Sequence, residues 1–256
     1  MSGSVDKAFD ILELVAESRG GLKHAEIAKA LHIPKSSVSK LLAGLVNRDY
    51  LMIDTRSKTY TIGPHVLVLA NWYLTGRDIV QIAKPILQDV VIKTGESASL
   101  QVRSGKVAII VCKEHCSQQI MVARLNIGDR LPLYATAAGK AILAFLPSEE
   151  INQFISSVEL TPLTRTTITD PQILLRELRT IRARAVARCN EEQIEGLIAI
   201  AAPVFSWDGR VVASITTPFS KMRANGQKEI NIENVLREAA AEISRQLGHS
   251  WNAMGL

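Results

Sequence analysis

Residues 22–51 read LKHAEIAKALHIPKSSVSKLLAGLVNRDYL, and this stretch decides the fold of the first part of the chain. Apolar residues repeat at three- and four-residue steps in two blocks, which the turn-forming residues 32–34 separate. This pattern predicts a short helix, a tight turn and a second helix that runs from Pro34 to about Arg48. The apolar face of the second helix consists of Val38, Leu41, Leu42 and Leu45.

The segments on either side complete a small unit. Residues 4–17, SVDKAFDILELVAE, carry a single apolar stripe and predict a helix. Residues 51–54 and 59–62 predict two short strands joined by a tight turn, and Gly63-Pro64 breaks the pattern. Three helices and a hairpin make a winged helix-turn-helix over residues 1–63, and the apolar spacing in 64–77 predicts a linker helix.

Residues 78–256 have a different pattern of predicted helices and strands, and this pattern predicts a second domain. Hairpin signals at Ser104-Gly105 and Asp208-Gly209 join strands over 98–102 and 106–111, and over 197–204 and 210–217. A further strand is expected over 120–125. Helices are expected over 79–94, with a kink or restart at Pro85, and over 136–146, 170–188 and 230–247. Because strands and helices mix without strict alternation, the fold class expected is α+β.

Composition excludes several classes of protein. The chain has 256 residues, 47% of them hydrophobic, which is enough apolar surface to exclude disorder as the main state. The longest apolar run, 197–205, is less than half of the roughly 20 residues that a membrane span needs. The N-terminal residues are acidic where an export signal would be apolar, and three cysteines make no disulfide framework. We therefore expect a cytoplasmic protein with no membrane partner.

Positive charge is concentrated in the first domain. The formal net charge is +5, and residues 19–63 hold eight Lys and Arg against three Asp and Glu. The major groove of DNA admits one helix with an apolar back and a small, polar, basic front, which the 34–48 helix offers. A core helix with a solvated face has the same periodicity. The order of short helix, turn, small-fronted helix and basic hairpin favours double-stranded DNA as the partner.

The DNA-contacting residues are predicted from their positions. The start of the second helix suits phosphate or base contact and carries Lys35, Ser36 and Ser37. Base edges are assigned to Ser39, Lys40 and Ala43. The hairpin tip, expected along the DNA backbone or minor groove, carries Arg56 and Lys58.

These segments resemble the IclR family of bacterial transcriptional regulators. The resemblance rests on the two N-terminal stretches quoted above and on GDRLPLYATAAGKAILAFLP (128–147), LTRTTITDP (163–171) and EEQIEGLIAIAAPVFSWDGRVVASI (191–215). It implies a winged-helix DNA reader, a linker helix and a GAF-like mixed α/β domain that binds a small metabolite. It also implies a dimer or a dimer of dimers on a near-palindromic operator.

Residues 134–139 lead into a helix, and most of them are small. A helix N-terminus can hold a carboxylate, but from the residues alone plain helix packing is the favoured explanation. The family resemblance instead favours a small-molecule cavity here. The resemblance places the effector site at Leu125, Ala135, Thr136, Ala137, Ala138, Gly139, Cys189, Leu197, Ala199 and Thr216. Three residues depart from the family pattern by removing polar groups: Cys189, Ala199 and Pro218. We therefore expect a carboxylate-bearing metabolite, such as a sugar acid or an aromatic acid, in a less polar cavity.

Two other patterns point to metal or thiol chemistry only weakly. Cys112, His115 and Cys116 supply three potential zinc ligands, whereas a closed structural site needs four. Cys189 lies among glutamates, and a nucleophilic cysteine needs a basic neighbourhood. We expect no cofactor, no metal and no catalytic residue. The alternative class is a small-molecule enzyme that carries a helical adaptor domain.

Overall fold

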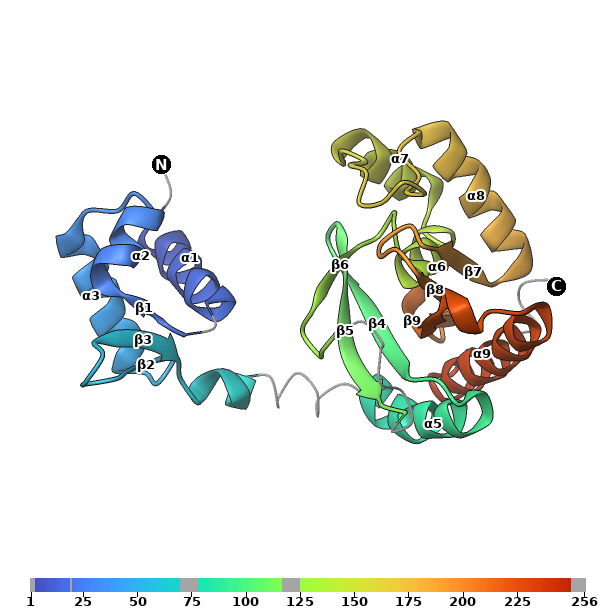
Figure 1. The fold of residues 1–256 in the computed structure, drawn as a ribbon, viewed down its shortest axis with the longest axis horizontal. Coiled ribbons are helices and arrows are strands. Elements are labelled where there is room, and N and C mark those ends of the chain that lie inside the picture. The colour runs from blue at the N-terminus through green and yellow to red at the C-terminus, as the bar shows by residue number, and fades with distance from the viewer. Residues whose placement is uncertain (1–2, 19, 70–77, 117–124, 250–256) are drawn as a thin grey trace. The chain divides into compact units, whose positions relative to one another are not determined.

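The computed structural model describes residues 3–18, 20–69, 78–116 and 125–249. The chain divides into two compact units, Met1–Gly76 and Arg77–Leu256 (Figure 1). Each unit is described by itself.

The N-terminal unit is a winged helix-turn-helix, as the sequence predicts. Its helices are α1 (Ser4–Glu17), α2 (His24–Ala30) and α3 (Lys35–Val46), and its strands are β1 (Leu22–Lys23), β2 (Leu51–Ile53) and β3 (Thr59–Ile62), in the order β1-β3-β2. The buried core is formed by Ile11, Val15, Ile27, Ala28, Ile33, Val38, Leu42 and Leu51. Strand β1 was not predicted, because a two-residue strand has no periodicity to detect.

Gly63, which follows β3, packs against the segment that joins α3 to β2. Its backbone N–H donates to the Tyr50 carbonyl at 2.8 Å, and a Cβ at this position would lie 2.2 Å from the Asp49 carbonyl oxygen. Only glycine fits there. Residues 65–69 of the predicted linker helix are helical, and 70–77 lie outside the described residues.

The C-terminal unit is built on a six-stranded sheet in the order β6-β5-β4-β9-β8-β7, with antiparallel neighbours throughout. Its strands are β4 (Ala98–Ser104), β5 (Val107–Glu114), β6 (Arg130–Pro132), β7 (Ala187–Asn190), β8 (Leu197–Phe205) and β9 (Val211–Ser220). Its helices are α5 (Asp78–Thr94), α6 (Ala137–Leu143), α7 (Ser148–Ser157), α8 (Pro171–Arg184) and α9 (Gly226–Gln246), with a 3-10 turn at Lys221–Arg223.

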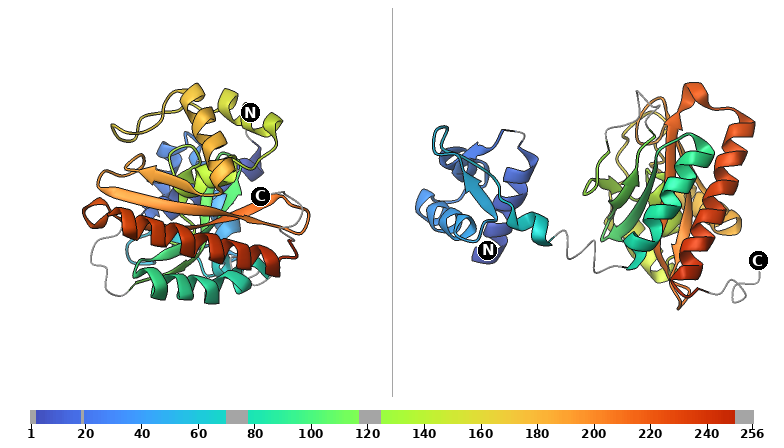
Figure 2. Two further views of the ribbon diagram at one scale, coloured as in Figure 1. Left: turned by 90° about the vertical axis from the view of Figure 1, so that its right-hand side faces the viewer. Right: turned by 90° about the horizontal axis from the view of Figure 1, so that it is seen from below.

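The helices of this unit lie in layers on the sheet. Helices α5 and α9 pack side by side on one face, as both views in Figure 2 show. Helix α6 packs on β7, β8 and β9, and α8 packs on α6. The space beside α6, over strands β5, β4 and β9, holds the cavity described below.

Several boundaries differ from the predicted ones for local reasons. Helix α5 continues through Pro85. Proline has no N–H, so one backbone carbonyl in the preceding turn has no hydrogen-bond donor within the helix. Because Pro85 is exposed, water can donate to that carbonyl. The helix predicted to reach residue 188 ends at Arg184, where Ala185 adopts a left-handed conformation (φ 51°) and turns the chain into β7. Most of the strand predicted over 120–125 lies outside the described residues.

Candidate functional site

Helix α3 has a buried back and an exposed front. Val38 and Leu42 are 0% and 1% exposed, because α3 packs on α1 and α2. The predicted DNA-contacting residues on this helix lie on its other sides: Lys35, Ser36, Ser39, Lys40 and Ala43 are exposed, and Ser37 is half-buried. The front of α3 therefore presents two ammonium groups, hydroxyls and one methyl group to solvent.

One residue outside α3 belongs to the same exposed surface as the front of this helix, and it was not among the residues predicted from the sequence. His24, the first residue of α2, lies 2.9 Å from Ser39 Oγ through its Nε2 atom. The Ser39 hydroxyl donates to the Lys35 carbonyl at 3.0 Å. A serine has one hydroxyl hydrogen, so when that hydrogen is donated to the Lys35 carbonyl, His24 Nε2 is the donor to Ser39 Oγ. No sequence spacing predicts this contact between residues 15 positions apart.

The β2–β3 hairpin is held in shape by Asp54. Its Oδ1 accepts hydrogen bonds from the backbone N–H groups of Arg56 at 2.7 Å and Ser57 at 3.1 Å. These bonds lower the pKa of Asp54, because they stabilise the carboxylate. Lys58 adopts a left-handed conformation (φ 57°), which completes the turn. Arg56 and Lys58 are both exposed at the hairpin tip.

The C-terminal unit contains a cavity at the predicted position. The enclosed space is about 40 Å³, and it reaches about 600 Å³ only when the adjoining space that opens to solvent is included. Eight of the ten predicted effector-site residues line it: Leu125, Thr136, Ala137, Ala138, Cys189, Leu197, Ala199 and Thr216. Pro218, one of the departures from the family pattern, also lines it.

The two remaining predicted residues, Gly139 and Ala135, make contacts beside the cavity. Gly139 allows α6 to lie against the backbone of Leu133, since a Cβ at this position would be 2.3 Å from the Leu133 Cα atom. The Ala135 carbonyl accepts a hydrogen bond from the Cys189 thiol at 3.3 Å. Neither residue is among those that line the cavity.

The start of α6 is also less open than predicted. Thr136 caps the helix, and its Oγ1 accepts a hydrogen bond from the Gly139 N–H at 3.1 Å. One of the free N–H groups expected for a carboxylate is therefore already used, and the helix is only seven residues long. The polar character of the cavity comes mainly from the sheet.

Polar side chains cross three neighbouring strands on the cavity side, and only one of them, Thr216, was among the predicted effector-site residues. Ser99 on β4 pairs with Lys113 on β5 and with Thr216 on β9, so these three side chains form a row. Gln101 lies two residues further along β4 and also lines the cavity. The alternation of Ser99 and Gln101 with apolar neighbours was the available signal, but it does not say which face is enclosed.

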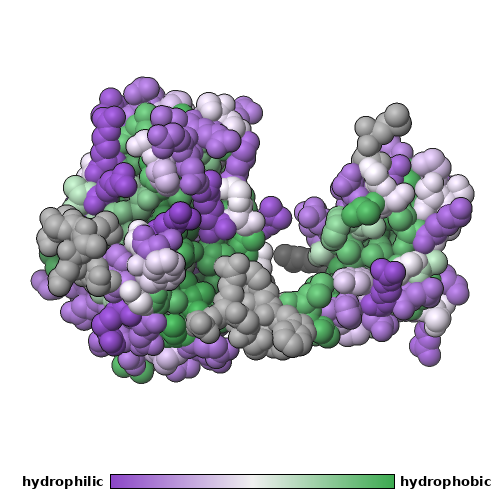
Figure 3. All heavy atoms as spheres, turned by 180° about the vertical axis from the view of Figure 1, so that it is seen from behind, coloured by the Kyte–Doolittle hydropathy of each residue, from purple (hydrophilic) through white to green (hydrophobic). Residues whose placement is uncertain are grey.

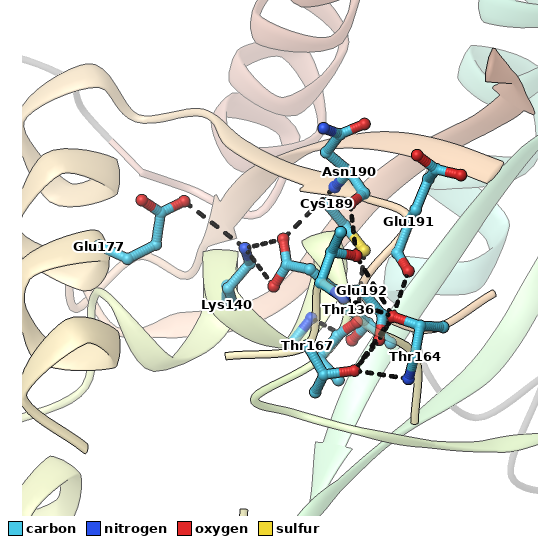
Figure 4. A network of polar contacts seen from close by, with 12 residues as sticks. Thr136, Lys140, Thr164, Thr167, Glu177, Cys189, Asn190, Glu191 and Glu192 are labelled. Carbon is cyan, nitrogen blue, oxygen red and sulfur yellow. Dashed lines mark hydrogen bonds and ion pairs between the residues drawn. The ribbon is translucent and has the colours of Figure 1, made fainter. Parts of the chain in front are cut away.

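A buried ion pair supports the segment between β7 and β8, which forms part of the cavity wall. Lys140 is fully buried, and its Nζ donates to Glu192 Oε1 at 2.7 Å and Oε2 at 2.9 Å, with Glu177 Oε1 at 3.5 Å (Figure 4). The Thr167 hydroxyl donates to the Glu192 carbonyl at 2.6 Å. Burial raises the pKa of Glu192, and the charge of Lys140 opposes this shift. These contacts fix the chain immediately after Cys189.

Cys189 is a poor candidate for a nucleophile. Burial, followed by the negative charge of Glu192, raises the pKa of its thiol to about 11. The thiol is therefore neutral near pH 7, and the reactive thiolate is scarce. In the described part of the chain, no three His, Cys, Asp or Glu side chains gather as a metal site requires, and no helix there is long and apolar enough to cross a membrane.

Comparisons with known proteins match both units. The family described as Bacterial transcriptional regulator IclR C-terminal matches residues 71–245, and the IclR helix-turn-helix domain matches residues 4–54. The chain is 29% identical over 245 residues to the HTH-type transcriptional repressor AllR of Klebsiella pneumoniae, covering 96% of this chain and 90% of that protein. It is 31% identical over 241 residues to the HTH-type transcriptional regulator BhcR of Paracoccus denitrificans, covering 94% and 86%. The crystal structure of Thermotoga maritima IclR aligns with a TM-score of 0.77 at 32% identity, covering 96% of this chain and 99% of that one.

Proposed function

This chain belongs to the IclR family of bacterial transcriptional regulators. From that premise we propose that it binds a near-palindromic operator, and that a small organic acid bound in the C-terminal cavity changes its affinity for this operator. The observation that carries the DNA-binding part is the exposed, small and basic front of α3 above a fully buried apolar back. The alternative of a small-molecule enzyme with a helical adaptor has less support, since the named relatives are regulators and Cys189 is a neutral thiol.

The contacts to DNA follow from the exposed groups. Phosphate contacts are assigned to Lys35, Ser36 and Ser37 at the start of α3, and base-edge contacts to Ser39, Lys40 and Ala43 along its front. The hairpin residues Arg56 and Lys58 contact the DNA backbone or minor groove.

The operator is bound by a dimer or a dimer of dimers. In the N-terminal unit, Val5 and Phe9 on α1 are 68% and 60% exposed, and Leu67 is 72% exposed. Figure 3 shows hydrophobic residues at the surface of the protein among hydrophilic ones. A second copy of the chain is the occupant that would cover them and place two α3 helices one or more DNA turns apart, about 34–36 Å per turn.

The acid changes operator binding by changing how the subunits of the oligomer are arranged. A ligand shifts an equilibrium only if it binds two states with different affinity, so the acid must favour one arrangement of the DNA-binding units over another. We place the protein in the cytoplasm, as a repressor, because its relative AllR is named as one.

The test is operator binding measured by fluorescence anisotropy over a salt series. Lys58→Ala should weaken binding to every sequence alike and reduce the salt slope by about 1, because one phosphate contact is lost. Lys40→Ala should relax the preference for the operator over base-substituted duplexes. Lys93→Ala removes an exposed lysine from the C-terminal unit and serves as the matched control. A Lys58→Ala slope equal to that of Lys93→Ala, or an unchanged preference in Lys40→Ala, would contradict these roles.

A further inference from the structure

Two of the residues that line the cavity each have a buried polar atom that makes no hydrogen bond to any described part of the chain. Gln101 and Thr216 are 3% and 4% exposed, and within the described part of the chain neither Gln101 Oε1 nor Thr216 Oγ1 makes a hydrogen bond. The amide nitrogen of Gln101 donates to Ser99 Oγ at 3.4 Å, so the amide oxygen is the atom of this side chain without a hydrogen bond to the described residues. Buried polar atoms are nearly always paired, so these two atoms indicate that something else occupies the cavity.

A single hydroxyl group satisfies both atoms. The Gln101 oxygen only accepts, whereas the Thr216 hydroxyl can donate. Gln101 and Thr216 are diagonal neighbours on β4 and β9, since Gln101 pairs with Ser214 and Ser99 pairs with Thr216. A ligand hydroxyl can therefore donate to Gln101 and accept from Thr216 at the same time.

The opposite end of the polar row carries a cation. Lys113 on β5 is half-buried, and its ammonium group donates to the Leu125 carbonyl, which leaves two further donors. Burial lowers the pKa of Lys113, and Asp129 opposes this shift. An anion in the cavity would offset this cost of burial. Lys113 is the one residue with a formal charge among the described residues that line the cavity.

The rest of the wall is mainly apolar, although Ser97, Thr136 and Gln193 also line it. Its apolar residues include Ala137 and Ala138 on α6, together with Ile110, Leu131 and Leu197. Lys113 and Thr216 stand two strand spacings apart, about 10 Å. A group held by Lys113 and a group held by Thr216 therefore belong at opposite ends of one molecule.

We propose that the effector is a distal hydroxy acid: an otherwise apolar monocarboxylate whose carboxylate binds Lys113 and whose hydroxyl, at the far end of the molecule, bridges Gln101 and Thr216. This inference rests on the proposed function and names the ligand class of its cavity. A 2-hydroxy acid does not fit the arrangement, because its hydroxyl lies beside the carboxylate.

The test is isothermal titration calorimetry of the full chain with two sets of probes. One set is 6-hydroxyhexanoate, 2-hydroxyhexanoate and hexanoate, and the other is 4-hydroxybenzoate, 2-hydroxybenzoate and benzoate. In at least one set, the distal hydroxy acid should bind at least about tenfold more tightly than both of its partners, because only it pairs the buried atoms.

Three variants and one control separate the roles. Gln101→Met and Thr216→Val keep the shape of the wall and should remove the preference for the hydroxy acid while weak binding of the parent acid remains. Lys113→Met should abolish binding of all acids. Thr217→Val is the matched control, because Thr217 Oγ1 is also buried without a partner in the described part of the chain but does not line the cavity. This control should keep the full preference, and circular dichroism should show that each variant is folded.

The outcomes distinguish this inference from the proposed function. The inference is wrong if no probe binds, if no distal hydroxy acid is preferred, or if the preference survives in both Gln101→Met and Thr216→Val. Operator binding without acid is measured on the same preparations. A wild type that prefers the hydroxy acid but does not bind DNA would support the ligand class and contradict the proposed function, whereas the reverse pattern would overturn the ligand class alone.

Discussion

Replacement of the fully buried Lys140 by methionine should destabilise the C-terminal unit in a pH-dependent manner. The side chains of Lys140 and Glu192 are 1% and 8% exposed, and two hydrogen bonds join them. Methionine retains most of the apolar stem of lysine but leaves the Glu192 carboxylate without its counter-ion. A buried carboxylate without a counter-ion takes up a proton rather than stay charged.

The magnitude follows from that proton uptake. The pKa of a glutamate in the unfolded chain has an ordinary value of 4.5. At pH 7, a carboxyl group that must be protonated to fold costs about 3 kcal/mol, because each pH unit above the unfolded pKa costs about 1.4 kcal/mol. At pH 5.5 the same cost is about 1 kcal/mol. Since the folded pKa is raised, the stability of the variant is fully present below the unfolded pKa and falls as pH rises toward the folded pKa.

The assay is urea unfolding of the full chain at pH 5.5 and pH 7, followed by circular dichroism. The transition of the N-terminal unit, in which nothing is changed, is the internal control. Lys140→Met combined with Glu192→Gln removes the charge but keeps an oxygen that can accept from the Asn190 N–H, which donates to Glu192 Oε1 at 3.3 Å. This double variant should recover most of the loss at pH 7 and show little dependence on pH. A Lys140→Met loss of equal size at both pH values would refute the reasoning.

Three further predictions concern the hairpin, the DNA-facing surface and the cavity. Gly63→Ala should lower the stability of the N-terminal unit by about 2 kcal/mol or more, because its Cβ would overlap the Asp49 carbonyl, and the urea unfolding transition of that unit measures this. His24→Ala and Ser39→Ala should have non-additive effects on operator affinity, since His24 acts through the Ser39 hydroxyl; additive effects in a double-mutant cycle would exclude that coupling. The thiol of Cys189, with its pKa of about 11, should resist alkylation at pH 8 and react as pH approaches 11, as peptide mapping by mass spectrometry would show.

Part of the site could be read from local sequence. The front of α3 follows from the periodicity of residues 34–48, because a helix that buries Val38 and Leu42 must expose Lys40 and Ala43. The small residues at 136–138 mark the cavity, since they lie in one helix turn and share its surroundings. Gly139 shows the limit of this reasoning. A small residue permits close approach of a ligand or of a backbone, and only the position of Leu133 decides which.

The sequence by itself determined the two domains, the winged helix and most of the helices and hairpins, because each depends on periodicity, caps and turns within about 20 residues. Only the tertiary structure decided the chemistry of the cavity. Lys113, Ser99 and Thr216 come from strands as much as 117 residues apart, and the strand register makes them neighbours. Whether a buried hydroxyl or amide has a partner depends on every element packed around it. The fold therefore decides that Gln101 and Thr216 have buried atoms without a hydrogen bond to the described residues, that His24 contacts Ser39, and that Glu192 is the counter-ion of Lys140. No local sequence pattern encodes these contacts.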